Sequence, residues 1–498
     1  MMNDSQNPSA AAPARESYQP GHFVGRGKEL DIIKEKVRSG LDGAPIPKSV
    51  IHIWGPPGIG KSWLLQHLAH EYNSGPQDQI GPSPKKCGTL AAQVDFRDLE
   101  LSQKNPLSIA QVVAGIFDQL QRPDPNGSLP EETKAFQAKY EQFKQSPNGA
   151  GEIPGLLECF LEYVKWLTEC YVPLLLFDGV EKLPSDDFFW LEREIIAPLA
   201  RTDRVLFVIA SRKELPRWKE FSVRQRLEVW ELQGFDLQTT QEQLTRYALP
   251  EEAAREIYPY TFGYPYANQI LGAAWQEGKP SAEKIPIFLS QIEKELLENA
   301  VLERERDILR ALSTLRRFNV ESARRFLKQA VDPEFGALSD GYYLRLFEML
   351  EQAGLVFWNS EQRGYVCSRE VRGILQSRLR LAEPERYQEL HQHALEMYQQ
   401  WIEHYQGQEE RFFPEMLYHC IQQYCGDATV LRREVIALLE RWLTPDHFNG
   451  EQLDSLYHLI AADPELEAAL PPALYEKILT RIEQQKNEPM KEATSCSS

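Results

Sequence analysis

One octapeptide limits the folds open to this chain more than any other feature of the sequence. Gly55-Pro-Pro-Gly-Ile-Gly-Lys-Ser62 matches the pattern GxxxxGK[ST] at every defined position. It follows a short apolar run, Ser49 to Trp54, and precedes helical periodicity from Trp63 to Tyr72. Glycines at these spacings let backbone N–H groups close around phosphate oxygens, and the start of the following helix favours negative charge. The pattern therefore predicts a strand, a phosphate-binding loop and a helix, in that order.

The residue types in this loop also predict its ligand. Lys61 is expected to reach the β- and γ-phosphates of a nucleotide, and Ser62 is expected to hold Mg²⁺. The predicted cofactors are therefore ATP or ADP together with Mg²⁺. The residues expected to surround the phosphates are Gly55, Pro56, Pro57, Gly58, Ile59, Gly60, Lys61, Ser62 and Trp63.

Further apolar runs predict a parallel sheet around this loop. Leu90 to Phe96 is predicted to be a second strand. Val172 to Phe177 and Arg204 to Ala210 are unbroken apolar runs, typical of strands buried on both faces. Strands that alternate with helical patterns imply crossover connections. The predicted fold class is therefore an α/β P-loop NTPase domain over residues 21–235, with Pro123 to Gly155 as a surface insertion.

Beyond Phe235 the patterns are mostly helical. Gly354 to Trp358 and Gly364 to Cys367 are strand-like runs on either side of a polar turn, and they follow three helical patterns, which predicts a winged helix. From Pro384 onwards we expect a TPR-like helical array. Since no strict repeat of about 34 residues is visible, the prediction goes no further than an array of helices. The predicted parts are a disordered leader (1–20), the α/β domain (21–235), a helical lid (236–298), the winged helix (299–383), the array (384–485) and a disordered tail (486–498).

Three residues join Lys61 in the predicted catalytic set. Asp178 ends the most apolar strand, where a carboxylate can hold Mg²⁺ opposite the phosphate loop. Gly179 cannot orient a water molecule, so Glu181 is the available general base, the alternative being a solvated loop charge. Arg212 follows another apolar strand, where a cation can sense the γ-phosphate, the alternative being a surface arginine.

The order of these motifs resembles the STAND class of signal-transducing P-loop ATPases, which includes the NACHT and NB-ARC switches. The resemblance covers about residues 22 to 380, and it implies that Val24 touches adenine, Arg26 lies at the interface of the nucleotide domain and Pro265 covers the base from the lid. The segments that carry it are Phe23-Val-Gly-Arg26, the phosphate loop, Leu175-Leu-Phe-Asp178-Gly-Val-Glu181, Ile209-Ala-Ser-Arg212 and Phe262-Gly-Tyr-Pro265.

Two positions depart from this class. Lys182 stands where the class carries an acidic residue after the strand, which predicts a slow ATPase that serves regulation. Ser368 stands where class members often carry a histidine that contacts bound ADP. That contact is therefore absent, or it is supplied by Ser368 or Arg369.

The distribution of charge bears on partners. Of a formal net charge of -18, residues 299–380 hold 14 Lys and Arg against 11 Asp and Glu, whereas residues 381–498 hold 9 against 21. Counterion release needs a basic face, so nucleic acid is an unexpected partner. Helical arrays usually bind protein, so we expect a protein partner on the array, and self-association into a homo-oligomer on activation. No apolar run of about 18 residues exists, so a cytoplasmic protein without a membrane span is expected.

Two functions lead at this point, ahead of a metabolic or transport ATPase, for which the sequence holds no substrate motif. The first is a STAND-type switch, in which ADP holds the lid and winged helix closed and ATP, or a ligand on the array, opens them. The second is an AAA+-like ATPase that binds or remodels DNA through its winged helix. The residues that favour DNA binding are Arg316, Arg317, Arg324 and Arg325. The acidity of the chain opposes it, and we expect the winged helix to pack against the nucleotide domain, with those arginines paired or solvated.

Overall fold

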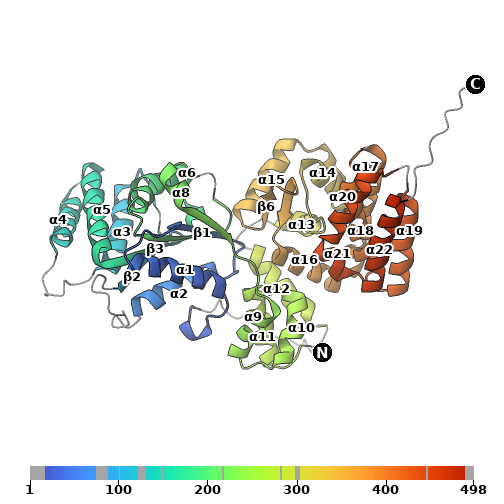
Figure 1. The fold of residues 1–498 in the computed structure, drawn as a ribbon, viewed down its shortest axis with the longest axis horizontal. Coiled ribbons are helices and arrows are strands. Elements are labelled where there is room, and N and C mark those ends of the chain that lie inside the picture. Colours follow the sequence, from blue (N-terminus) through green and yellow to red (C-terminus); the bar gives the residue numbers. More distant parts are fainter. Residues whose placement is uncertain are drawn as a thin grey trace, which may run out of the picture.

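The computed structural model describes residues 17–74, 88–99, 101–121, 130–146, 150–215, 218–280, 283–297, 303–405, 407–444 and 447–487. An α/β domain lies at one end of the molecule, a helical array lies at the other, and a lid and a winged helix lie between them (Figure 1). The predictions of disorder over 1–16 and 488–498 fall outside the described residues. In the part that is described, no helix is long and apolar enough to cross a bilayer.

A five-stranded parallel sheet forms the centre of the α/β domain. Its strands are β1 (Val50–Trp54), β2 (Gly88–Asp95), β3 (Tyr171–Asp178), β4 (Leu206–Ser211) and β5 (Leu227–Glu231). Their order across the sheet is β2-β3-β4-β1-β5, and every neighbouring pair is parallel. The predicted α/β fold class is confirmed, and the carboxyl ends of β1, β3 and β4 meet at one edge of the sheet.

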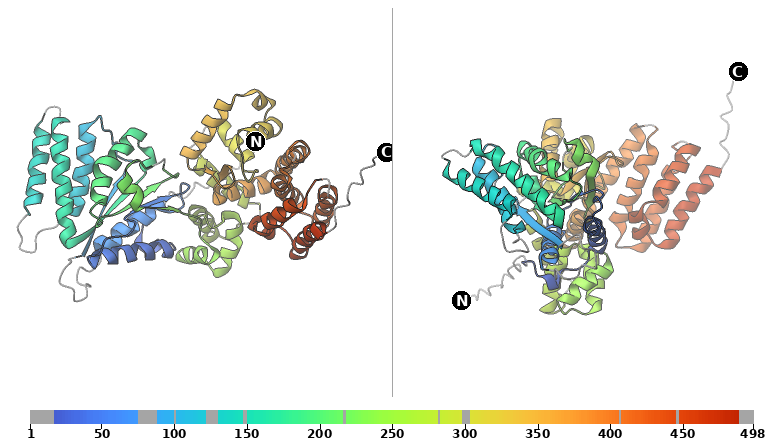
Figure 2. Two further views of the ribbon diagram at one scale, coloured as in Figure 1. Left: turned by 45° about the horizontal axis from the view of Figure 1, so that its top comes forward. Right: turned by 60° about the vertical axis from the view of Figure 1, so that its left-hand side comes forward.

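Helices cover both faces of this sheet (Figure 2). Successive side chains of a strand point to opposite faces, so Leu174 and Leu176 join one core whereas Leu175 and Phe177 join the other. The first core is covered by α1 (Gly27–Leu41) and α2 (Lys61–Ser74). The second is covered by α3 (Pro106–Leu120), α4 (Glu131–Gln145), α5 (Ile153–Cys170), α6 (Ser185–Leu191), α7 (Ala197–Ala200) and α8 (Phe221–Arg226).

Three details of this domain differ from the sequence prediction. Strand β5 was not predicted, because Leu-Glu-Val-Trp-Glu contains no unbroken apolar run and does not alternate strictly between apolar and polar residues. The predicted surface insertion contains α4, whose Phe136 is buried in the second core. The last residues of the predicted leader contact the domain, because the ring of Tyr18 packs edge-on against Trp63 with centroids 5.6 Å apart.

The helical lid follows β5 directly. Its helices are α9 (Leu237–Arg246), α10 (Glu251–Thr261), α11 (Pro265–Gln276) and α12 (Ile285–Leu297). Asp236 caps α9 by accepting a hydrogen bond from the Thr239 N–H at 2.7 Å. The N–H of Phe235 donates to the carbonyl of Gly263 at 2.8 Å. This bond ties the turn between α10 and α11 to the segment that leaves the sheet.

The winged helix contains the hairpin that the sequence predicts. Its elements are α13 (Glu303–Leu312), α14 (Val320–Ala330), α15 (Asp340–Gln352), β6 (Val356–Asn359), β7 (Gly364–Cys367) and α16 (Arg369–Ala382). Strands β6 and β7 pair antiparallel and form the wing.

The array consists of helices packed side by side (Figure 2). They are α17 (Pro384–His404), α18 (Glu409–Tyr424), α19 (Ala428–Trp442), α20 (Gly450–Ala461), α21 (Pro464–Ala469) and α22 (Pro472–Asn487). Lys486 and Asn487, which the sequence placed in a disordered tail, belong to α22. His391 and His419 are buried between α17 and α18, with their Nδ1 atoms 2.9 Å apart. Among the described residues, no cluster of three metal-binding side chains occurs.

Buried ion pairs join the winged helix to the array. Arg316 Nε lies 2.9 Å from Glu415 Oε2, and the same guanidinium also pairs with Asp463. Arg372 donates to Glu465 Oε1 and to the Tyr418 hydroxyl, both at 2.6 Å. Since each guanidinium has anionic or polar partners on the array, these arginines hold the two parts together.

Candidate nucleotide-binding site

The phosphate loop connects β1 to α2 in a conformation that requires glycine. Gly55, Gly58 and Gly60 have φ angles of 154°, 88° and 100°. A Cβ atom on Gly55 would lie 2.9 Å from the carbonyl oxygen of Leu232, and one on Gly58 would lie 2.8 Å from the hydroxyl of Tyr264. The backbone N–H groups of this turn are therefore left bare of side chains, as a phosphate cradle requires.

Lys61 begins α2 and folds back over this loop. Its Nζ donates to the carbonyl oxygens of Gly55 at 2.6 Å and Pro56 at 2.9 Å. Burial lowers the pKa of Lys61 to about 8, against the opposing effect of Glu181 and Asp178. The lysine is thus a buried cation whose present partners are neutral carbonyls, and a phosphate would be a better one.

An arginine that the sequence analysis did not select holds Asp178. The Arg97 Nη2 atom lies 2.8 Å from Asp178 Oδ2, and the Arg97 Nε donates to Asp95 Oδ1 at 2.8 Å. Asp95 and Asp178 end the neighbouring strands β2 and β3 in matching register, so one guanidinium spans both carboxylates. Gly179 makes room for it, because a Cβ there would lie 2.7 Å from the Arg97 Cγ. The signal in the sequence was Asp95-Phe-Arg97 directly after an apolar strand.

Glu181 and Arg212 form a second ion pair at the same edge of the sheet. The Arg212 Nε lies 3.3 Å from Glu181 Oε1, and the glutamate side chain is only 5% exposed. Its other oxygen, Oε2, is buried without a hydrogen-bond partner among the described residues. Glu181 is therefore not a solvated loop charge, whereas Lys182 is exposed. The catalytic roles of Glu181 and Arg212 stay predictions.

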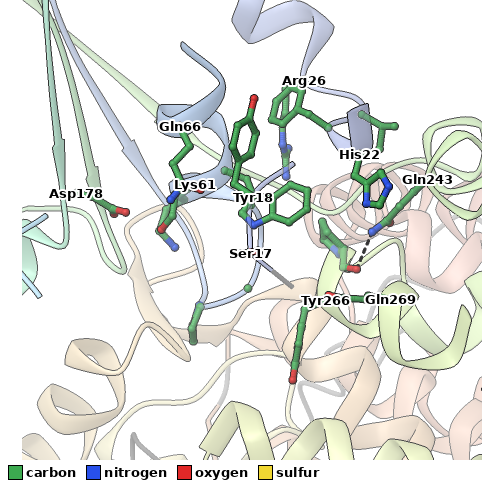
Figure 3. Close-up of a pocket in the computed structure, with 18 of the residues that line it drawn as sticks. Ser17, Tyr18, His22, Arg26, Lys61, Gln66, Asp178, Gln243, Tyr266 and Gln269 are labelled. Carbon is green, nitrogen blue, oxygen red and sulfur yellow. Dashed lines mark hydrogen bonds between the residues drawn. The ribbon is translucent and has the colours of Figure 1, made fainter. Parts of the chain in front are cut away.

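A cavity of about 350 Å³ connects these ion pairs to the lid (Figure 3). Lys61 and Asp178 lie at one end of it, and His22, Arg26 and Gln243 lie at the other. The sequence-predicted residues that line it are Val24, Arg26, Pro57, Gly58, Gly60, Lys61, Ser62, Trp63, Asp178, Glu181, Arg212 and Pro265. Gly55, Pro56 and Ile59 do not line it. Ile59 lies in the core, and Gly55 and Pro56 contribute the carbonyls that hold Lys61.

The far end of the cavity is built from three segments. Arg26, with a left-handed φ of 60°, donates to the carbonyls of Gln233 at 2.8 Å and Ile59 at 2.6 Å. Gln243 of the lid donates to the carbonyl of Pro265 at 2.9 Å, the bond drawn in Figure 3. The further lining residues that the sequence analysis missed are Ser17, Tyr18, His22, Phe23, Gln66, Arg97, Phe235, Gln243, Tyr247, Tyr266 and Gln269. Several are aromatic, which suits the flat face of a base.

The winged helix rests directly on this site. A Cβ on Gly354 would lie 2.7 Å from the Arg212 carbonyl oxygen, so the two backbones are in close contact. The ring of Phe357 on β6 packs edge-on against Trp54, at the end of β1, with centroids 5.2 Å apart. Ser368, one of the two residues considered for an ADP contact, instead caps α16 and does not line the cavity.

A second contact of the winged helix lies at the lid end. Glu370 in the first turn of α16 accepts a hydrogen bond from the Gly234 N–H at 2.7 Å. A Cβ on Gly373 would lie 2.3 Å from the ring of Phe262, so α16 also packs closely against the end of α10. The winged helix therefore contacts both walls that flank the cavity.

The donor set fits a nucleotide with Mg²⁺. Lys61, Arg97 and Arg212 provide three cations at the phosphate end, against the carboxylates of Asp178 and Glu181. A glycine cradle, a buried lysine bonded to carbonyls and an unpartnered carboxylate oxygen all lie within one cavity. Ser62 and Asp178 are the residues suited to a divalent cation there.

The sheet order and the loop between β1 and α2 form a parallel α/β core like that of P-loop nucleotide-binding proteins. Solved structures with a similar arrangement include the Walker-type ATPase PABY2304 of Pyrococcus abyssi, with a TM-score of 0.44 and 15% identity over 71% of this chain and 96% of that one. The RuvB Holliday junction branch migration motor of Thermotoga maritima has a TM-score of 0.32 and 14% identity over 70% and 93%. The Orc1 protein of Aeropyrum pernix, solved in complex with DNA, has a TM-score of 0.35 and 13% identity over 73% and 93%. No protein-family model and no curated protein sequence matches this chain.

Proposed function

We propose that this protein is a STAND-type molecular switch, in which the nucleotide in the cavity sets how the α/β domain, the lid and the winged helix are arranged. The observation that carries the proposal is the contact of Gly354 with Arg212, because Arg212 lines the phosphate end of the cavity. A change in the partner of Arg212 would act directly on the backbone of the winged helix. The contact of Glu370 with Gly234 supplies the second attachment that such a change would strain.

The two ion pairs at the phosphate end are the proposed sensing elements. ATP with Mg²⁺ would supply the phosphate charge and the divalent cation that Lys61, Ser62 and Asp178 are suited to hold. Arg97 and Arg212 now neutralise Asp178 and Glu181, and each guanidinium lies where it can exchange its carboxylate for a phosphate oxygen. That exchange would release Asp178 and Glu181 from their arginine partners.

We further propose that hydrolysis is slow and serves regulation. Glu181 is the carboxylate available to orient an attacking water, but its Oε1 atom faces Arg212. Lys182 stands where the class carries an acidic residue, and it does not line the cavity. It therefore supplies no second carboxylate there. Turnover therefore depends on separating Glu181 from Arg212, the same step that would release the winged helix.

The output is proposed to pass through a protein partner on the array, with self-association on activation. The array is joined to the winged helix by the pairs of Arg316 and Arg372, so it would move with the winged helix as one body. Its sequence is strongly acidic, which favours a partner with a basic surface.

DNA binding through the winged helix is the second candidate function, and the observations disfavour it. In a helix-turn-helix protein the second helix of the motif enters the major groove. Here α15 has that position, and it carries Asp340, Glu348 and Glu351 against a single arginine, Arg345. Arg316, one of the four arginines that favoured this candidate, is buried against carboxylates of the array.

Hydrogen exchange tests the switch most simply. With ADP bound, the amide of Gly234 and those of residues 354–373 should exchange slowly, because they lie where the winged helix packs against the α/β domain and the lid. With ATP bound, the same amides should exchange faster, while those of the buried strand β3 should not change. Equal protection in both nucleotide states would contradict the proposal.

Fluorescence anisotropy with a DNA duplex separates the two candidates. At about 0.15 M salt and with ATP present, we expect no sub-micromolar binding. Arg324→Glu with Arg325→Glu is the control pair, because neither arginine belongs to the buried pairs with the array. Tight binding that this double variant abolishes would put DNA binding ahead of the switch.

A further inference from the structure

A second cavity, of about 250 Å³, lies where the winged helix meets the array. Its floor is aromatic, with the buried side chains of Phe318, Tyr398 and Trp401. The rings of Tyr405 and Phe412 complete the box, with centroids 6.2 Å and 5.4 Å from that of Trp401. The cavity is slightly below the roughly 300–1,000 Å³ that is typical of sites for drug-sized ligands, so it suits a smaller one.

The charge at the rim selects the kind of ligand. Aromatic boxes commonly hold cations, but the charged residues that line this one are Arg317, Arg363 and Arg411 against the single carboxylate of Glu321. Glu321 is already an acceptor for the Tyr405 hydroxyl at 2.7 Å. A cation would be repelled here, whereas a planar anion can stack on the rings and face the arginines.

We propose that this cavity is a binding site for a small aromatic carboxylate. The ring of the ligand lies in the box formed by Tyr398, Trp401 and Phe412. Its carboxylate faces Arg411 at the rim. Because Arg317 belongs to the winged helix and Trp401 to the array, the ligand contacts both parts at their junction.

The test uses 2-naphthoate as the probe and its neutral amide, 2-naphthamide, as the matched control, with saturation-transfer NMR on the full chain. The carboxylate should bind at least about tenfold more tightly than the amide, because only the carboxylate carries charge toward the arginines. Arg411→Gln removes a cation that faces the carboxylate, and it should weaken 2-naphthoate binding about three- to tenfold.

Trp358→Phe is the control variant, since Trp358 is an exposed wing residue outside the cavity, and it should leave binding unchanged. Absence of 2-naphthoate binding would overturn the proposal. Equal binding of acid and amide would overturn the choice of an anion. Binding that Arg411→Gln does not weaken would place the probe elsewhere and would also overturn it.

Discussion

Arginine–carboxylate pairs occur in two regions of this molecule, and their burial differs. At the phosphate end of the nucleotide cavity, Arg97 is 39% exposed beside Asp178. Between the winged helix and the array, Arg316 is 13% exposed and has two carboxylate partners, Glu415 and Asp463. A pair that borders a cavity can exchange its carboxylate for an incoming anion, whereas opening a buried pair leaves charges unpaired. The same chemistry therefore suits the first region to respond to a ligand and the second to hold two parts together.

The largest effect should come from breaking the buried ion pair between the winged helix and the array. Glu415→Gln removes the charge opposite Arg316 and Arg317, and it should lower the free energy of unfolding by about 3–5 kcal/mol. Urea denaturation measures this change. ATP affinity should stay the same, since Glu415 is remote from the nucleotide cavity. A loss of less than about 1 kcal/mol would mean that this pair is not structural.

The same pair also predicts an effect of acid. Burial alone would raise the pKa of Glu415, but Arg316 and Arg317 hold it below its ordinary value. A carboxyl whose pKa is lowered by folding contributes stability above its unfolded pKa, and that stability is lost as the pH falls through the folded pKa. The wild type should therefore lose more stability between neutral and acidic pH than Glu415→Gln does.

The next largest effect should come from the phosphate end of the nucleotide cavity. Lys61→Ala removes the buried cation of the phosphate loop, and it should weaken ATP binding about 100-fold, because hydrogen bonds to charged groups contribute roughly 1.5–3 kcal/mol each. Calorimetry measures the affinity, and the unfolding free energy should stay close to that of the wild type. An ATP affinity within about threefold of the wild type would defeat the assignment of this loop.

At the phosphate end a rise in pH should weaken ATP binding, whereas between the winged helix and the array a fall in pH should lower stability. Burial lowers the pKa of Lys61 to about 8, so the lysine of the nucleotide-free protein loses its charge as the pH rises through that value. Since phosphate binds the charged form, ATP affinity should be greatest below pH 8 and should fall about tenfold between pH 7 and pH 9. The dependence should be absent in Lys61→Ala. A flat profile in the wild type would contradict it.

The smallest expected effect comes from the exposed pair. Arg97→Gln frees Asp178, and it should raise the affinity for ADP with Mg²⁺ about three- to fivefold, in line with the modest energy of a partly exposed ion pair. ATP affinity should not rise, because Arg97 is also lost as a phosphate ligand. Arg193→Gln, which breaks an exposed pair with Glu194, is the control and should change neither affinity. If ADP affinity does not rise, Arg97 does not compete for Asp178.

The sequence predicted the parts of this site that depend on local patterns. Apolar runs, and the residues that end them, predict both the loop from Gly55 to Ser62 and the position of Asp178 at the end of a strand. Asp95-Phe-Arg97 after an apolar strand indicated charge at this edge of the sheet, but it did not assign the role of Arg97, which arises from the register that sets Asp95 beside Asp178 on the neighbouring strand. The bond between Glu370 and Gly234 joins residues 136 positions apart, and no periodicity in either segment predicts it.

The second cavity illustrates the same limit. In the sequence, Trp401 and Phe412 are aromatic residues of two helical stretches, as expected of core positions. The cavity beside them arises only from the packing of α17 and α18 against the winged helix. Strand β5 is a milder case, since two glutamates interrupt the apolar residues of this short strand at the edge of the sheet. Long-range packing therefore determined most of what the sequence analysis missed.

Energy transfer between the α/β domain and the array tests the central claim most directly. Cys170 at the end of α5 and Cys425 after α18 are exposed and can carry a donor and an acceptor dye in a variant whose Cys87, Cys159 and Cys496 are replaced by serine. We predict one transfer efficiency with ADP and a different one with ATP, and no difference between the two nucleotides in the same variant carrying Lys61→Ala. Identical efficiencies with ADP and ATP at saturating concentrations would show that the nucleotide does not control the arrangement of the domains. The proposal of a molecular switch would then be wrong.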